Sequence, residues 1–397
     1  RNMGMTKISA SNIAVLNLGF RIFFLGAGAY SILAIFLWTG VFSLNYAVAT
    51  DTLSAFQWHA HEMIYGYCAA VISGFILTAV KNWTGIQTVH GSQLAFIFCL
   101  WLIARLLFLF APDFVIIAAI LDLTFITAVI IAAAYPIIKS RNWRQLGILS
   151  KLALLAVFNS LFYLGHAGIL EQGLDWGIYG GLYLVIGLIL TLGGRVIPSF
   201  TESGVGYRVK LANPKWITPS GLMVFLVFFL SEVFLKNPVM TEISAAALFI
   251  IYSFRLFGWY TPGIWKKPLL WSLYISMVFI NAGFLLLALG SFFEISKFIA
   301  VHSLAYGGVG VVTLGMMARV ALGHTGRNIN EPPSIVKYSL VAMVIGAVVR
   351  VFFPIVLPDQ YLIWVFVSQG LWLLAFILFL MVYAPMLIRR RVDGQFG

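Results

Sequence analysis

The most telling shortage in this 397-residue sequence is of charge. Asp, Glu, Lys and Arg together make up 10% of the residues, against about 25% in an ordinary soluble protein. A soluble fold of this size needs a polar surface, and so few charges cannot provide one. The shortage therefore excludes a soluble enzyme, a nucleic-acid-binding domain and a disordered chain.

Cysteines and nucleotide-binding motifs are scarce as well. The two cysteines, Cys68 and Cys99, both lie inside apolar runs, which excludes a disulfide framework and a CxxC redox or metal site. The sequence has no Walker motif, no GxGxxG motif and no polar stretch long enough for a soluble nucleotide domain. An ATP-driven pump is therefore excluded.

What the chain has in abundance is apolar sequence, with 61% hydrophobic and 16% aromatic residues. Runs of about 20 such residues cross a bilayer as helices, because a helix pairs all of its own backbone groups. Twelve runs are predicted to do so: 20–44, 58–80, 92–110, 114–137, 148–170, 176–197, 216–235, 242–260, 268–290, 298–321, 334–355 and 361–388. Because the connections are short, we predict an all-α membrane protein with about twelve transmembrane helices. It forms one polytopic domain over 1–397, with an N-terminal segment (1–19), a helical bundle (20–388) and a basic tail (389–397).

The distribution of Lys and Arg predicts the orientation. These residues gather at the N-terminus and in the even-numbered loops: Lys7, Lys81, Lys139, Arg141, Arg144, Arg208, Lys210, Lys215, Lys266, Lys267, Arg327 and Arg389 to Arg391. The odd-numbered loops are acidic: Asp51, Asp113, Glu171, Asp175, Glu242, Glu294 and Asp359. Cytoplasmic loops carry the cations, so both termini are predicted to be cytoplasmic. The formal net charge of +12 then reflects loops beside a lipid bilayer and not a nucleic-acid partner.

This orientation brings scattered polar residues to one depth. Nine ionisable side chains fall in the outer part of the predicted spans: His59, His61, Glu62, Arg105, Asp122, His166, Glu232, His302 and Arg350. Ionisable groups inside a bilayer are costly and usually mark a functional site. A lone buried histidine is more often a packing residue, but four at one depth favour a cofactor site.

The residue types in this layer suit haem and copper. Neutral imidazole is the usual ligand of both, so His59, His61, His166 and His302 are the candidate metal ligands. Since guanidinium pairs with carboxylates, Arg105 and Arg350 are candidate partners of haem propionates. The alternative is that these arginines pair with Asp122, Glu232 or Glu62. His59 and His61 are two residues apart and point about 200° away from each other in a helix, so either one is not a ligand or they serve two centres.

Two stretches of the sequence share the same spacing and suggest internal repeats of four helices. The matching positions are His61 and His302, Gly66 and Gly307, Thr84-Gly85 and Thr325-Gly326, and Arg105 and Arg350. Membrane folds often place a binding site between repeats. His61 and His302 would then face a common centre as axial haem ligands. Tyr65 and Tyr306 each follow their histidine by four residues, where a hydroxyl can donate a hydrogen bond to a cofactor or relay protons.

Several strings resemble the NnrS family of nitric-oxide-response membrane proteins: the string 58–63 (WHAHEM), the run 74–85 (GFILTAVKNWTG), 194–201 (GRVIPSFT), 20–24 (FRIFF) and 322–327 (LGHTGR). The resemblance covers most of the chain. It implies a bacterial inner-membrane protein of about twelve helices that contains haem, taken here as b-type, and copper. It also implies a role in withstanding nitrosative stress.

Three functions follow as hypotheses. The first is a haem–copper centre near the periplasmic face that binds nitric oxide and, as in a nitric oxide reductase, turns it over. Glu62, Asp122, Glu232 and Tyr306 would then supply protons, and quinol or an external carrier would supply electrons. The second is a transporter of a metal, haem or a metal–nitrosyl species. The third is a haem-based sensor that signals through the loop 324–327, for which the simpler interpretation is a helix cap with Gly326 at positive φ.

Overall fold

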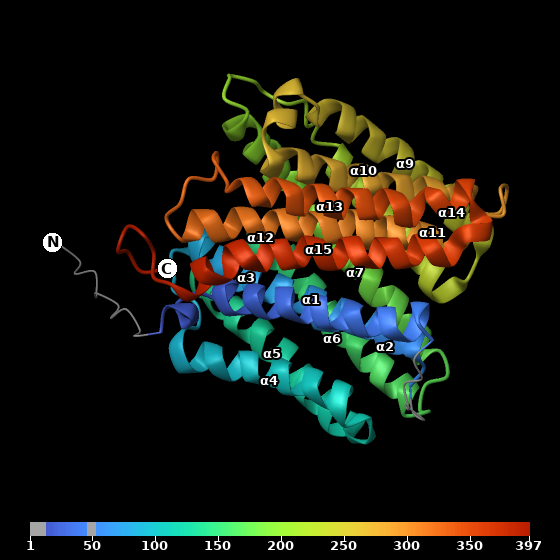
Figure 1. The fold of residues 1–397 in the computed structure, drawn as a ribbon, viewed down its shortest axis with the longest axis horizontal. Coiled ribbons are helices and arrows are strands. Elements are labelled where there is room, and N and C mark those ends of the chain that lie inside the picture. The colour runs from blue at the N-terminus through green and yellow to red at the C-terminus, as the bar shows by residue number, and fades with distance from the viewer. Residues whose placement is uncertain (1–12, 46–52) are drawn as a thin grey trace.

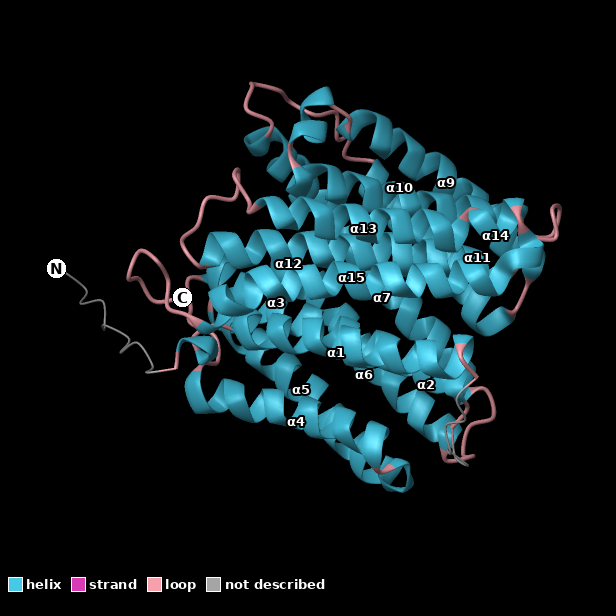
Figure 2. Cartoon of the chain, in the orientation of Figure 1, coloured by secondary structure: helices cyan, strands magenta, loops and turns pink. Residues whose placement is uncertain are grey.

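The computed structural model describes residues 13–45 and 53–397, and in this part of the chain it contains helices and loops but no strand (Figure 2). Twelve helices in the described ranges are long and apolar enough to cross a membrane. The prediction of an all-α protein with twelve spans is therefore confirmed. The spans are α1 (Gly19–Ser43); α2, η2 and α3 (Ala55–His61, Glu62–Cys68, Ala69–Thr84); α4 (Gly91–Phe110); α5 (Val115–Lys139); η4 and α6 (Trp143–Gln145, Leu146–His166); α7 (Gly173–Gly204); α8 and η5 (Ile217–Phe229, Leu230–Leu235); α9 (Pro238–Trp259); α10 (Pro268–Leu289); α11, η7 and α12 (Lys297–His302, Ser303–Gly310, Val311–His324); α13 and α14 (Ser334–Val351, Phe353–Val356); and η8 and α15 (Pro358–Gln360, Tyr361–Ile388).

Three spans form the centre of the bundle. Of the 18-residue apolar stretch in each span, 83% is buried in the span of α2, η2 and α3, 78% in that of α11, η7 and α12 and 72% in α7, whereas no other span exceeds 61%. Their glycines allow this burial: a Cβ added at Gly180 or Gly307 would overlap the ring of Phe158 or Phe279. Small residues let helices approach closely inside a membrane. The other nine spans pack around these three.

The start of α1 and the last residue of the sequence lie at the same end of the bundle. Arg21, near the start of α1, donates hydrogen bonds from Nε to the carbonyl oxygen of Gly397 at 2.8 Å and from Nη1 to that of Leu387 at 2.9 Å. The opposite end holds α2 and the start of α11, as Figure 1 shows. Which end faces the cytoplasm stays a prediction from the loop charges.

Two of the central spans widen immediately after a histidine. The helix becomes a π-helix at η2, directly after His61, and again at η7, directly after His302. Such segments are rare and often lie at functional sites. The sequence predicted regular helices here, because apolar patterning does not distinguish a π turn from an α turn. Both spans also end on a glycine with positive φ, Gly85 at 70° and Gly326 at 79°, and the predicted repeats remain a prediction that fits these features.

Span α7 is longer than predicted and continues through Pro198 to Gly204. Proline leaves the carbonyl four residues earlier without its helical partner, and here the carbonyl oxygen of Gly194 accepts a hydrogen bond from Asn213 at 3.4 Å. The helix therefore persists across the proline. The sequence predicted a shorter span because the ends of the helix are polar, so the apolar run stops before the helix does.

The loop at 324–327 is covered by the C-terminal residues of the sequence. Val392 N donates to the carbonyl oxygen of Thr325 at 3.2 Å, and Arg391 Nη1 donates to that of His324 at 3.1 Å. Arg391 also hydrogen-bonds Asp393 and thereby lowers the pKa of that exposed carboxyl from 3.8 to about 2. With Gly326 at positive φ, the loop is a capped helix end packed against its own chain.

Candidate functional site

The nine ionisable residues of the predicted layer separate into distinct places. His61, Glu62, Arg105 and Asp122 form one buried charge network. His59, His302 and Arg350 line a cavity, which we call the two-histidine cavity. Glu232 pairs with Lys297 near the protein surface, and His166 lies half-buried at the end of α6. Depth alone predicted one cluster, and the packing of the helices divides it.

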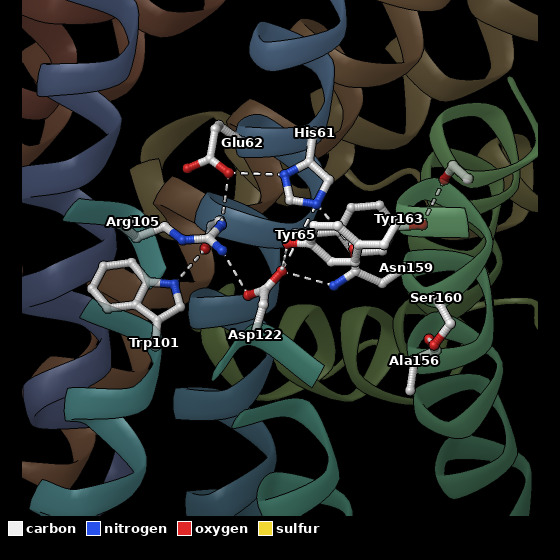
Figure 3. A network of polar contacts seen from close by, with 12 residues as sticks. His61, Glu62, Tyr65, Trp101, Arg105, Asp122, Ala156, Asn159, Ser160 and Tyr163 are labelled. Carbon is white, nitrogen blue, oxygen red and sulfur yellow. Dashed lines mark hydrogen bonds and ion pairs between the residues drawn. The ribbon is translucent and has the colours of Figure 1, made fainter. Parts of the chain in front are cut away.

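Arg105 is the centre of the buried charge network. Its guanidinium donates from Nη1 to Glu62 Oε1 at 3.0 Å and from Nη2 to Asp122 Oδ1 at 2.6 Å (Figure 3). Asp122 Oδ2 also accepts from Asn159 Nδ2 at 2.8 Å and from the Tyr163 hydroxyl at 2.9 Å. The alternative in which Arg105 pairs with protein carboxylates is thus the arrangement present in the structure.

Both ring nitrogens of His61 are taken up in the same network. Asn159 donates its amide NH₂ to Asp122, so its oxygen faces His61 Nε2 at 2.9 Å. An amide oxygen only accepts, so Nε2 carries a proton. His61 Nδ1 lies 2.8 Å from Glu62 Oε1. A second proton must therefore sit between these two atoms, either on the imidazole or on the carboxyl.

This proton count balances the network. With the second proton on either atom, Arg105 and the His61–Glu62 pair together offset the carboxylate of Asp122, and all four side chains are almost completely buried. Buried charges are tolerated when each is paired and hydrogen-bonded. The Tyr30 hydroxyl completes the set by donating to Glu62 Oε2. The network therefore joins α1, α2, η2, α4, α5 and α6 as a charge-balanced unit, in which Arg105 Nε is left without a partner among the described residues.

The two-histidine cavity has a volume of about 230 Å³, and aromatic rings form a large part of its wall beside aliphatic side chains. Its walls come from α1, α2, η2, α7, α11, η7, α13 and α15, at the end of the bundle opposite to Gly397. Phe56 and Phe298 line it and are more than half exposed, so it reaches the surface there. The aromatic lining comprises Trp38, Phe42, Phe56, Tyr67, Tyr179, Phe298, Tyr306, Tyr361 and Trp372.

His302 is held with one nitrogen committed to the backbone. Its Nδ1 lies 2.7 Å from the carbonyl oxygen of Phe298. Because a carbonyl only accepts, Nδ1 donates, and in a neutral ring Nε2 keeps the free lone pair. Arg350 Nη2 lies 3.2 Å from the same Nδ1 and donates to the hydroxyl of Tyr361 at 3.2 Å. The free nitrogen of His302 is the one suited to a ligand.

His59 stacks flat on Trp38, with ring centroids 4.3 Å apart and planes within 4°. Its buried Nδ1 has no hydrogen-bond partner among residues 13–45 and 53–397. The same holds for Arg350 Nη1 and for Gln369 Nε2, and all three side chains line the cavity. Buried polar atoms are almost always satisfied. Three buried polar atoms without a hydrogen-bond partner, all around one cavity, indicate that a polar ligand binds there.

Arg105 and Arg350, which occupy matching positions of the predicted repeats, differ in their carboxylate partners. Arg105 has two carboxylate partners, whereas no carboxylate of the described residues pairs with Arg350, which is 6% exposed. Burying a charge is expensive unless it is compensated. Arg350 therefore has the electrostatic environment expected of a side chain that binds an anionic group from outside the chain.

The two predicted tyrosines also lie in different places. The Tyr306 hydroxyl donates to the carbonyl oxygen of Ser368 at 2.6 Å, and the side chain lines the cavity. Tyr65 donates to the carbonyl oxygen of Gly177 at 2.5 Å, and its ring lies 5.0 Å from that of His61. Neither His61 nor Tyr65 lines the cavity, so a haem bridged by His61 and His302 would require the hydrogen bonds of His61 to break.

The donor set fits a haem better than a multi-ligand metal ion. Among the described residues no group of three or more His, Cys, Asp or Glu side chains could hold a metal ion. The cavity does offer an imidazole nitrogen for iron, a guanidinium for a carboxylate and aromatic walls for a flat apolar ring. These are the partners that haem needs.

Sequence reasoning missed several members of both sites. In the network these are Asn159 and Tyr163, and in the cavity Trp38, Tyr361 and Gln369. The spacing of Asn159 and Tyr163, i and i+4, places both on one face of α6 and could have identified them. Gln369, a lone amide within an apolar span, carried a similar signal.

The family model described as NnrS protein matches residues 14–391, nearly the whole chain. No curated protein matches the sequence significantly.

Proposed function

The chain belongs to the NnrS family, and on that premise we propose that it is an inner-membrane protein of the nitric oxide response that binds haem in the two-histidine cavity and nitric oxide at that haem. The observation that carries the proposal is Arg350. It is a buried cation with an unpartnered Nη1 beside two histidines, in a cavity walled by aromatic rings.

Each of these residues has a defined part in holding such a ligand. The hydrogen bond from His302 Nδ1 to the carbonyl oxygen of Phe298 fixes the ring and leaves Nε2 free for a metal, as such bonds to the other ring nitrogen do at many histidine ligands. Arg350 would pair with a propionate and so compensate its buried charge. His59, stacked on Trp38, offers a second imidazole to the same cavity.

The size of the cavity limits how the ligand can enter. At 230 Å³ it is slightly smaller than the range of about 300–1,000 Å³ typical of ligand pockets. A whole macrocycle would need the exposed rim rings of Phe56 and Phe298 to move aside. Since both rings are more than half exposed, few contacts oppose that movement.

Binding of nitric oxide is the activity that the geometry supports best. A bound haem would supply an iron atom able to bind the gas. Reduction would also need protons and a second metal. Glu62 and Asp122, two of the predicted proton donors, already accept hydrogen bonds within the network. Copper stays a prediction: His59 and His302 are its two candidate imidazoles in the cavity. The loop charges would put the cavity on the periplasmic side.

The proposal is tested on the full chain, purified after expression with a haem supply. We expect a Soret band with about one haem per protein, and a shift of that band on anaerobic addition of nitric oxide. Nitrous oxide release with a reductant would extend the proposal to turnover. Folded protein that binds no haem, or a haem spectrum that does not change on addition of nitric oxide, would contradict the proposal.

A further inference from the structure

A second cavity, the apolar chamber, lies farther along the three central spans. It has a volume of about 90 Å³ and presents no polar atom to its interior. Its lining comes from the end of η2, from α3 and α7, from the start of α12 and from Phe24 of α1: Phe24, Cys68, Val71, Ile72, Phe75, Ile76, Val185, Leu188, Ile189, Leu192, Gly193, Val196, Ile197, Val312, Thr313 and Met316.

The lining decides what the chamber can hold. A buried water needs two to four polar partners, and an apolar cavity of about 150 Å³ stays dry and takes up benzene or xenon. The chamber is smaller than that cavity and equally apolar. It therefore suits a molecule of a few apolar atoms and neither an ion nor a metal complex.

The chamber adjoins the two-histidine cavity. Cys68 and Val185 line both spaces. Beside them the hydroxyl of Tyr67, which lines the cavity, lies 2.8 Å from the Oγ1 of Thr313, which lines the chamber. The boundary is thus two apolar side chains and one hydrogen-bonded pair, with no charged residue among them.

The chamber is also accessible to apolar molecules. Its lining side chains Phe75, Ile189 and Met316 are only partly buried, and the spans around it are the length of a bilayer core. From these observations we propose that the apolar chamber binds a small apolar gas and supplies it to the two-histidine cavity. The supply step rests on the proposed function, in which the gas is nitric oxide.

Xenon tests the binding site without reference to haem. Crystals of the full chain pressurised with xenon should show a xenon atom in the chamber. Val312→Phe and Val71→Phe each place a ring in that space and should remove the xenon, and two separate variants guard against one that fails to fold. Val227→Phe, a matched change at an exposed position of α8, should keep it. An empty chamber in the wild type, or elongated lipid density in it, would overturn the proposal.

Nitric oxide kinetics test the supply step. In haem-loaded protein, rebinding of nitric oxide after flash photolysis should be several-fold slower in Val312→Phe and Val71→Phe than in the wild type and in Val227→Phe. Unchanged rebinding in variants that have lost the xenon site would refute the supply step. If the protein binds no haem, the proposed function fails while the xenon result still decides the binding site.

Discussion

Replacing Arg350 by leucine is expected to weaken haem binding by at least an order of magnitude, while leaving the ligand-free protein as stable as the wild type, or more stable. Arg350 has no carboxylate partner among the described residues, so its removal leaves no charge of the described structure unpaired. Replacing a poorly compensated buried charge by an apolar side chain is often neutral or stabilising. Losing one partner of a buried charge pair with the ligand costs about 2–5 kcal/mol, or roughly 30-fold to several-thousand-fold in affinity.

The measurement is a haem titration followed by absorbance, together with thermal unfolding of the ligand-free protein in detergent. Arg319→Leu is the matched control, because Arg319 is buried against the ring of Phe200 at 4.0 Å and does not line the cavity. Asp51→Asn is a second control, because the carboxyl of Asp51 lies outside the described residues. Unaltered haem affinity in Asp51→Asn would separate binding of the ligand by Arg350 from pairing of Arg350 with this carboxyl. Wild-type affinity in Arg350→Leu would show that Arg350 binds no anionic ligand.

The same substitution at the matching position should have the opposite effect. Arg105→Leu is expected to lower the free energy of unfolding by about 3–5 kcal/mol, the usual cost of breaking a buried pair. The reason is that Glu62 and Asp122 would remain buried with their shared cation removed. Haem affinity of the fraction that folds should change little, because Arg105 does not line the cavity.

Thermal unfolding and the yield of monodisperse protein report this effect. Arg255→Leu is the control, since Arg255 is equally buried, lies over the rings of Tyr252 and Trp259 and pairs with no carboxylate of the described residues. Adding Asp122→Asn to Arg105→Leu should recover part of the loss, because it removes one uncompensated charge. Equal stability of Arg105→Leu and Arg255→Leu would mean that the network does not stabilise the fold.

The twelve spans could be predicted because each apolar run carries its own signal. A run of about 20 apolar residues has to pair its backbone internally inside a bilayer, whatever its neighbours are. The glycine cap at Gly326 was predictable for the same local reason, since positive φ favours glycine. The length of α7 was not, because its helical ends are polar and include Pro198.

The site was predicted in composition but not in arrangement. The loop charges give the depth of a side chain, whereas the direction in which it points depends on which helices lie beside it. The separation of His59 and His61 follows from their spacing of two residues in a helix, but the sequence did not show that His59 would lie in the cavity and His61 in the network. The π-helices after His61 and His302 rotate the residues that follow, so spacing along the sequence did not fix their neighbours.

Haem content of two single-histidine variants tests the central claim most directly. The account places the ligand in the two-histidine cavity, so purified His302→Ala should lack the Soret band. His61→Gln, which can keep hydrogen bonds within the network, should retain it once its folded fraction is confirmed by size-exclusion chromatography. Haem retained in His302→Ala, or lost from folded His61→Gln, would contradict the account and favour a site built around His61.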